Sequence, residues 1–114
     1  MSNVIDSMDR FGALDISSER DGERYVITLT GELDLAGADR VTQELLQAEA
    51  TDVSEVVLDL EELTFIDSSG IAVILAADAR SRADGERLRL NGGSAHVRRV
   101  FELSGLTDRL PFAG

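Results

Sequence analysis

Hydrophobic and polar positions alternate in the first third of the chain, which is the pattern of β-strands. Residues 14–17 are predicted to form a short strand, and residues 25–30, rich in β-branched and aromatic side chains, a second one. The turn at residues 20–23 contains Asp-Gly and predicts an antiparallel hairpin. Residues 1–10 are polar and acidic without periodicity, and we expect a frayed lead-in outside the core.

A helical pattern follows the hairpin. After a break at residues 31–34, apolar residues recur at helical spacing, with polar residues on the opposite side. These apolar positions are Ala38, Val41, Leu45 and Ala48. Residues 56–60 then form an apolar run interrupted by Asp59, which is typical of an interior strand covered on both faces.

The second half of the chain alternates helices with strands. Residues 69–82 are predicted to form a helix, and residues 87–90 a strand. A third helix begins after Ser94, a favourable N-cap. It ends at Gly105, because a glycine followed by a hydrophobic residue is typical of a Schellman stop. A short last strand is expected at residues 109–112.

These elements predict one α/β domain over residues 1–114, with its core at about residues 12–112. We expect a mixed β-sheet in which an N-terminal antiparallel hairpin is followed by βα units, with the helices packed on the sheet and right-handed crossovers. The chain is 43% hydrophobic and 29% charged, which gives it enough apolar residues for a core. It should fold alone.

Charge and composition restrict the function. Acidic residues outnumber basic ones by 22 to 11, and the net charge of −11 disfavours nucleic acid and anionic membranes as partners. Cysteine and lysine are absent, and His96 is the only histidine. We therefore expect no enzyme, no metal site and no cofactor. The longest apolar run, residues 71–77, is far too short to span a membrane, so we expect a cytoplasmic protein.

The most informative stretch is residues 65–70, Phe-Ile-Asp-Ser-Ser-Gly, directly before that apolar run. It places a carboxylate and two hydroxyls at the start of a helix. One interpretation is a capping sequence, because Ser and Asp accept hydrogen bonds from the free N–H groups of a helix start. The other is a phosphorylation site, because the helix dipole tolerates a phosphate there without unfolding the protein.

The helix that follows is more apolar than a helix lying on a sheet requires. Seven consecutive apolar residues, 71–77, run all the way round it. Either a neighbouring element covers the surplus, or it forms a docking face rimmed by Arg80 and Arg82.

Three motifs resemble those of STAS-domain anti-sigma factor antagonists, in the same order and with compatible spacing. The sequence LDLEELTFIDSSGI at residues 58–71 is similar to the family's signature. GELD at residues 31–34 is similar to the loop after its second strand, and VRRVFELSGL at residues 97–106 to its third helix and stop. The resemblance covers about residues 12–112 and implies the STAS fold.

The resemblance also implies a partner-switching regulator. Unphosphorylated, such a protein binds an anti-sigma factor with serine kinase activity and so releases a sigma factor. Phosphorylation by that kinase inactivates it, and a serine phosphatase is the third partner. The family pattern makes Ser68 the phosphorylated residue, with Asp67 and Asp34 beside it.

A helical wheel gives a different order of the two serines. It places Ser69, and not Ser68, on the side of Val73, Ala76 and Arg80, so Ser69 is the second candidate for phosphorylation. The predicted partner-binding residues are Asp34, Asp67, Ser68, Ser69, Gly70, Val73 and Arg80.

Other functions remain open at this point. A STAS-type module that senses a small ligand or serves as a scaffold in a signalling complex would also suit a loop that carries hydroxyls. The acidic residues Glu61, Glu62 and Asp67 are expected to be solvated and to bind no metal. The turn at residues 92–93 resembles a phosphate-binding loop only loosely, because the lysine is missing. His96 is expected to be an exposed surface residue.

Overall fold

The computed structural model describes residues 8–112 of the chain, and within them a single mixed sheet. In chain order the elements are β1 (Met8–Phe11), β2 (Leu14–Asp21), β3 (Arg24–Leu33), α1 (Leu35–Glu49), β4 (Glu55–Ile66), α2 (Ser68–Ala83), β5 (Leu88–Asn91) and α3 (Ala95–Leu103). The strands follow one another across the sheet in the order β1-β2-β3-β4-β5. Strands β1 to β3 pair antiparallel, whereas β3, β4 and β5 pair parallel.

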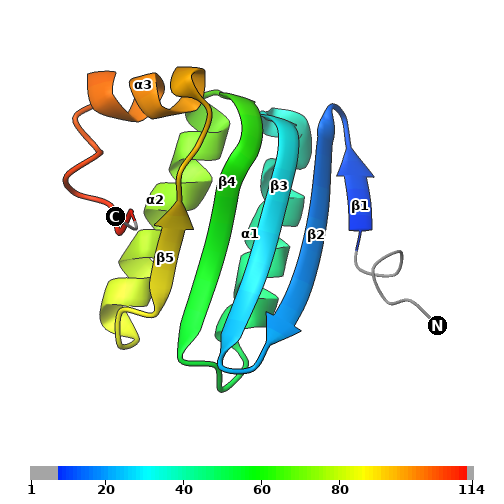
Figure 1. Ribbon diagram of the computed structural model, residues 1–114, viewed down its shortest axis with the longest axis vertical. Coiled ribbons are helices and arrows are strands. Elements are labelled where there is room, and N and C mark those ends of the chain that lie inside the picture. The colour runs from blue at the N-terminus through cyan, green and yellow to red at the C-terminus, as the bar shows by residue number, and fades with distance from the viewer. Residues whose placement is uncertain (1–7, 113–114) are drawn as a thin grey trace.

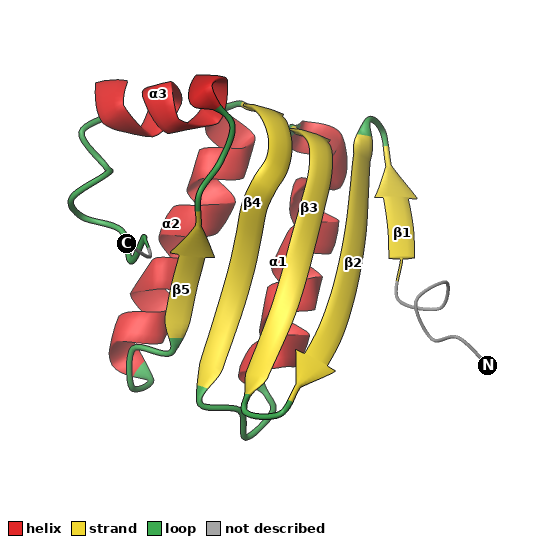
Figure 2. Ribbon diagram, in the orientation of Figure 1, coloured by secondary structure: helices red, strands yellow, loops and turns green. Residues whose placement is uncertain are grey.

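The helices lie on one face and at one end of this sheet. In Figure 1, α1 and α2 both lie behind the sheet, and each parallel strand lies to the left of the one before it, so both crossovers are right-handed. Figure 2 shows α3 across the end of the sheet where the parallel strands finish. The predicted α/β fold, a hairpin followed by βα units, is confirmed.

The core lies between the sheet and the two long helices. The four apolar positions predicted for the first helix, from Ala38 to Ala48, are all buried in α1. Strand β4 lies between β3 and β5, which confirms its predicted interior position in the sheet, and Val56, Val57 and Leu58 are each at most 2% exposed, although helices α1 and α2 cover one face only (Figure 1). Helix α2 buries one side only, through Gly70, Val73, Ile74 and Ala77.

The predicted ends of the third helix are confirmed. The Ser94 hydroxyl accepts a hydrogen bond from the N–H of Val97 at 3.3 Å. At the other end, Gly105 has a φ of 71°, and the N–H of Leu106 donates to the carbonyl of Phe101 at 2.9 Å. This six-to-one bond is that of the Schellman motif.

Four strand predictions were wrong. Residues 31–33, expected to break the strand, continue β3, where a register shift against β4 between Gly31 and Glu32 interrupts the regular pattern. Residues 8–10, expected to be a frayed lead-in, belong to β1, because a short edge strand needs only its backbone bonds to β2 and tolerates polar residues. Residues 61–66, expected to be a loop, continue β4, where register shifts against β3 disrupt the alternation. The expected last strand at residues 109–112 is an isolated bridge between Leu90 and Phe112.

Candidate functional site

Asp34 and Asp67 lie at the same edge of the sheet. Strands β3 and β4 end side by side, with Leu33 opposite Ile66, and a single residue separates each strand from the helix that follows. Asp34 is that residue before α1, and Asp67 before α2. The N–H of Asp67 donates to the carbonyl of Leu33 at 3.2 Å, so the two junctions are directly linked. The two carboxylates that the resemblance places beside Ser68 therefore lie at adjoining strand-to-helix junctions.

Asp67 alone caps α2. Its Oδ1 accepts hydrogen bonds from the N–H groups of Ser69 at 2.9 Å and Gly70 at 3.2 Å. Within residues 8–112, the structure shows no hydrogen bond made by the hydroxyl of Ser68 or of Ser69. The capping interpretation of the motif therefore applies to the aspartate and not to the serines.

The two serines differ in exposure. Ser68 is the first residue of α2 and is exposed, whereas Ser69 is half-buried. One turn after Ser69, Val73 is only 9% exposed and packs in the core. Arg80, further along the same side, binds both carboxylate oxygens of Glu49 on α1, at 2.8 and 3.1 Å.

Of the residues on the side of α2 that the helical wheel favoured, only Ala76 is exposed. A wheel drawn from α2 alone cannot tell which side α1 and the sheet will cover, and here they cover the side of Val73 and Arg80. Contrary to the sequence analysis, Val73 is not available at the surface and Arg80 is already paired.

The exposed side of α2 begins at Ser68. We define the α2 face as the exposed residues Ser68, Ala72, Leu75, Ala76 and Ala79. They follow one another at helical spacing, and Leu75 is 41% exposed. Apart from the serine, this face offers only apolar side chains. The apolar surplus predicted from the sequence thus lies on this side of the helix.

Gly70 lets the first turn of α2 lie against the ends of both strands. A Cβ at this buried position would lie 2.6 Å from Cγ1 of Ile66 and 2.8 Å from Cγ of Leu33, closer than such atoms approach in proteins. A glycine is required here for close packing. Gly70 therefore positions the serines without being accessible itself.

Two large apolar residues near this edge were missed by the sequence analysis. Leu35, the first residue of α1, is 77% exposed, although its spacing from Ala38 would place it on the buried side. Phe65, at the end of β4, is 39% exposed and stacks on the ring of His96 in α3, with ring centroids 5.9 Å apart. The expected exposure of His96 is confirmed. No sequence signal distinguishes Leu35 from a core residue, since its exposure depends on where the sheet ends.

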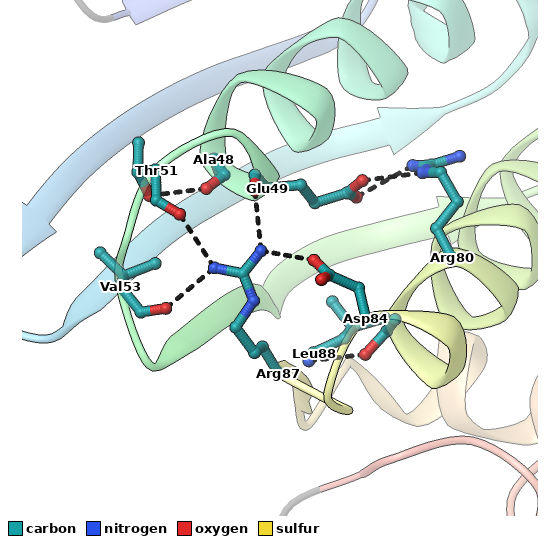
Figure 3. A network of polar contacts seen from close by, with 9 residues as sticks. Ala48, Glu49, Thr51, Val53, Arg80, Asp84, Arg87 and Leu88 are labelled. Atoms are coloured by element: carbon teal, nitrogen blue, oxygen red, sulfur yellow. Dashed lines mark hydrogen bonds and ion pairs between the residues drawn. The ribbon is translucent and has the colours of Figure 1, made fainter.

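The opposite end of the sheet holds a dense polar network, shown in Figure 3. The guanidinium of Arg87 donates to the carbonyl oxygens of Glu49, Thr51 and Val53, and to the carboxylate of Asp84, at 2.7 to 3.0 Å. The cavity beside it measures only about 20 Å³. Because these groups are bound to one another, this end has a structural role rather than a ligand-binding one.

A metal-binding cluster and a helix that could span a membrane are both absent from the described part of the chain. Residues 8–112 contain no group of three or more histidine, aspartate or glutamate side chains that could hold a metal ion. No helix among them is long and apolar enough to cross a bilayer.

Comparison with known proteins agrees with the sequence motifs. The profile of the family described as "Mlab, STAS domain" matches residues 16–111. An anti-sigma-B factor antagonist of Listeria monocytogenes is 32% identical over 90 residues, which cover 79% of this chain and 79% of the relative. An anti-sigma F factor antagonist of Paenibacillus polymyxa is 30% identical over 99 residues, 86% of this chain and 85% of the relative.

Solved structures agree as well. The anti-sigma factor antagonist SpoIIAA in its unphosphorylated form has a TM-score of 0.66 at 30% identity, covering 87% of this chain and 88% of that one. The phosphorylated form of SpoIIAA from Bacillus has a TM-score of 0.67 at 30% identity, covering 87% of this chain and 91% of that one. The resemblance inferred from the three motifs is confirmed.

Proposed function

The chain belongs to the STAS domain family, and on that premise we propose that it is an anti-sigma factor antagonist switched by phosphorylation of Ser68. Unphosphorylated, it binds an anti-sigma factor that has serine kinase activity and so releases a sigma factor. Phosphorylated by that kinase, it no longer binds. A serine phosphatase restores the active form, and the cycle takes place in the cytoplasm.

The free hydroxyl of Ser68 is the observation that carries this proposal. It is exposed at the start of α2, where Asp67 already caps the helix, so a kinase can reach it without opening the fold. The relative SpoIIAA, which has been solved in a phosphorylated form, shares the fold at 30% identity and supports the same chemistry here.

The α2 face supplies the binding surface in this proposal. Ser68 stands at the head of an exposed apolar row, so a partner that covers Leu75 and the neighbouring alanines also covers the serine. Asp34 and Asp67 lie at the same edge, and neither makes an ion pair within residues 8–112. Their charges favour a partner with cationic side chains around an apolar centre.

Phosphorylation then acts locally. A phosphate carries about −1.5 to −2 charges, and burying it at an apolar face without a matching cation costs several kcal/mol. Two carboxylates at the same edge add repulsion instead of compensation. The fold is unaffected because the Ser68 hydroxyl makes no hydrogen bond in the described structure and the helix N-terminus tolerates an anion.

The proposal assigns no catalytic turnover to this chain alone. Its sequence lacks cysteine and lysine, and its one histidine, His96, stacks on Phe65. The relatives found by comparison carry the names of regulatory proteins.

The test is phosphorylation by the cognate kinase, followed by mass spectrometry of the modified peptide. We expect one phosphate, on Ser68. The Ser68→Ala variant should accept none, while the matched Ser69→Ala variant should be modified as the wild type is. Normal phosphorylation of Ser68→Ala would overturn the assignment and make Ser69 the acceptor.

A further inference from the structure

A second hollow lies beside α3, away from the α2 face. It measures about 320 Å³ and is lined by Glu61, Asn91, Gly92, Arg98, Glu102 and Phe112, among others. Small-molecule sites are commonly of about this size or larger. The hollow lies at the carboxyl end of β5, which finishes at Asn91.

Glu61 is held at this hollow by a bulge in β4. Leu60 and Glu61 together lie opposite the single residue Leu29 of β3, because the register shifts between the pairs formed by Thr28 and Thr30. The Asp59 carboxylate accepts the N–H of Glu61 at 3.0 Å. Bulges of this kind redirect a side chain out of the regular alternation of a strand.

Gly92 provides the room for the Glu61 side chain. Its φ is 44°, and a Cβ at this position would lie 3.2 Å from both Cγ and Oε2 of Glu61. A larger residue would press on the carboxylate, and a left-handed backbone favours glycine as well. The turn noted in the sequence as a loose phosphate-binding loop thus accommodates a carboxylate in the structure.

Arg98 brings the opposite charge to the hollow. Within residues 8–112 the structure shows no ion pair for Arg98, although Glu102 lies one helical turn further along α3 and lines the same hollow. By contrast, Arg80 and Arg87 at the other end of the molecule are both paired. The hollow is therefore lined by one guanidinium and two carboxylates, and the described structure shows no ion pair between them.

We propose that this hollow binds a small zwitterion of the α-amino acid class. The two carboxylates, of Glu61 and Glu102, take the ammonium group, and the guanidinium of Arg98 takes the carboxylate in a charge-assisted contact. The two carboxylates would repel a simple anion, and the arginine would repel a simple cation. The ring of Phe112 lies beside the ligand's carbon atoms. This site is independent of phosphorylation, because it contains neither Ser68 nor the α2 face.

The test is a titration of the ¹⁵N-labelled full chain with each standard L-amino acid, up to about 10 mM, which saturates a site with a Kd near 1 mM. We expect saturable shifts of the amides of Gly92 and of Thr107, which also lines the hollow, with at least one of these amino acids. The same compound as its amide, without the carboxylate, and as its N-acetyl derivative, without the ammonium, should each bind at least about tenfold more weakly.

Variants assign the charges. Arg98→Gln and Glu61→Gln should each weaken binding at least about tenfold, since each removes a charged hydrogen-bonding partner. Arg99→Gln is the matched control, because Arg99 is exposed on the same helix, lacks an ion pair in the described chain and does not line the hollow. The absence of saturable shifts with every amino acid would overturn the proposal, as would equal binding of the amide or an equal loss in Arg99→Gln.

Discussion

At the amino ends of the parallel strands Arg80 and Arg87 are bound to other groups of the protein, whereas at the carboxyl ends a hydroxyl and several apolar side chains face solvent. Arg87, only 19% exposed in its side chain, joins the chain after α1, the end of α2 and the start of β5. Ser68, at the other end, touches none of these elements through a hydrogen bond in the described structure.

This difference indicates that one end of the sheet stabilises the fold and that the other end is available to bind a partner. The carbonyl groups at the end of a helix need partners, and Arg87 supplies one for Glu49, the last residue of α1. It also binds the carbonyl oxygens of Thr51 and Val53 in the segment after that helix. At the other edge, a single carboxylate from Asp67 completes the cap of α2, and the remaining polar and apolar groups are available to a partner. The following changes would break or sharpen this contrast.

The largest effect is expected from phosphorylation of Ser68. Affinity for the anti-sigma factor should fall about a thousandfold, or ~4 kcal/mol, because the phosphate must lose water at an apolar surface. Titration calorimetry of the two forms measures this. The Ser68→Asp variant should lose part of that affinity, and Ser68→Ala should bind and resist the switch.

Circular dichroism of the phosphorylated protein completes this prediction. The spectrum should equal that of the unmodified protein, since the change is local. Equal affinity of the two forms would contradict the mechanism, and a large spectral change would replace local repulsion with a conformational switch.

A substitution at the other end should affect stability and leave recognition intact. Arg87→Met keeps much of the side chain's apolar contact but leaves three carbonyl oxygens and Asp84 without their cation. We expect a loss of about 2–3 kcal/mol in the free energy of unfolding, measured by urea denaturation.

The matched control is Arg89→Met, two residues along β5. Arg89 is exposed and lies 3.7 Å from Glu55; it donates to the carbonyl oxygens of Glu86 and Leu88, at 3.0 and 2.8 Å, close to itself in sequence. Because its contacts are local and open to solvent, the loss should stay below about 1 kcal/mol. The folded fraction of Arg87→Met should still bind the partner with wild-type affinity. Equal losses in the two variants would show that Arg87 has no special structural role.

The same contrast explains what could be predicted from the sequence. The order of elements from β2 to α3, the capping serine of α3 and the glycine stop follow local patterns, and all three are confirmed. The three carbonyl partners of Arg87 come from a segment more than thirty residues away, so no local pattern indicates them. The wheel error at Val73 has the same origin, because tertiary packing decides which side of α2 is covered. The bulge at Glu61 likewise depends on pairing with β3.

A smaller effect is expected at the cap of α2. Asp67→Ala removes the acceptor for two N–H groups and should reduce the free energy of unfolding by about 1 kcal/mol. Asp67→Asn keeps a side-chain oxygen and should stay close to the wild type. If the alanine variant is as stable as the asparagine variant, then one of the serines caps the helix when the Asp67 carboxylate is missing. That result would contradict the assignment of the cap to Asp67 alone.

The smallest effect is expected at the exposed pair of Arg20 and Asp52, whose atoms approach to 2.8 Å. The hydrogen bond from Arg20, and then its charge, hold the pKa of Asp52 below the ordinary 3.8. A carboxyl whose pKa is lowered in the folded state stabilises that state above its unfolded pKa, and the contribution is lost as the pH falls through the folded-state pKa. Because solvent screens this pair, Asp52→Asn should shift the urea midpoint only slightly near neutral pH, and the difference should vanish in strong acid. If the difference in urea midpoint does not depend on pH, the substitution acts through something other than the charge of Asp52. If the loss of stability is as large as that of Arg87→Met, this solvent-exposed pair is an essential contact, contrary to our expectation.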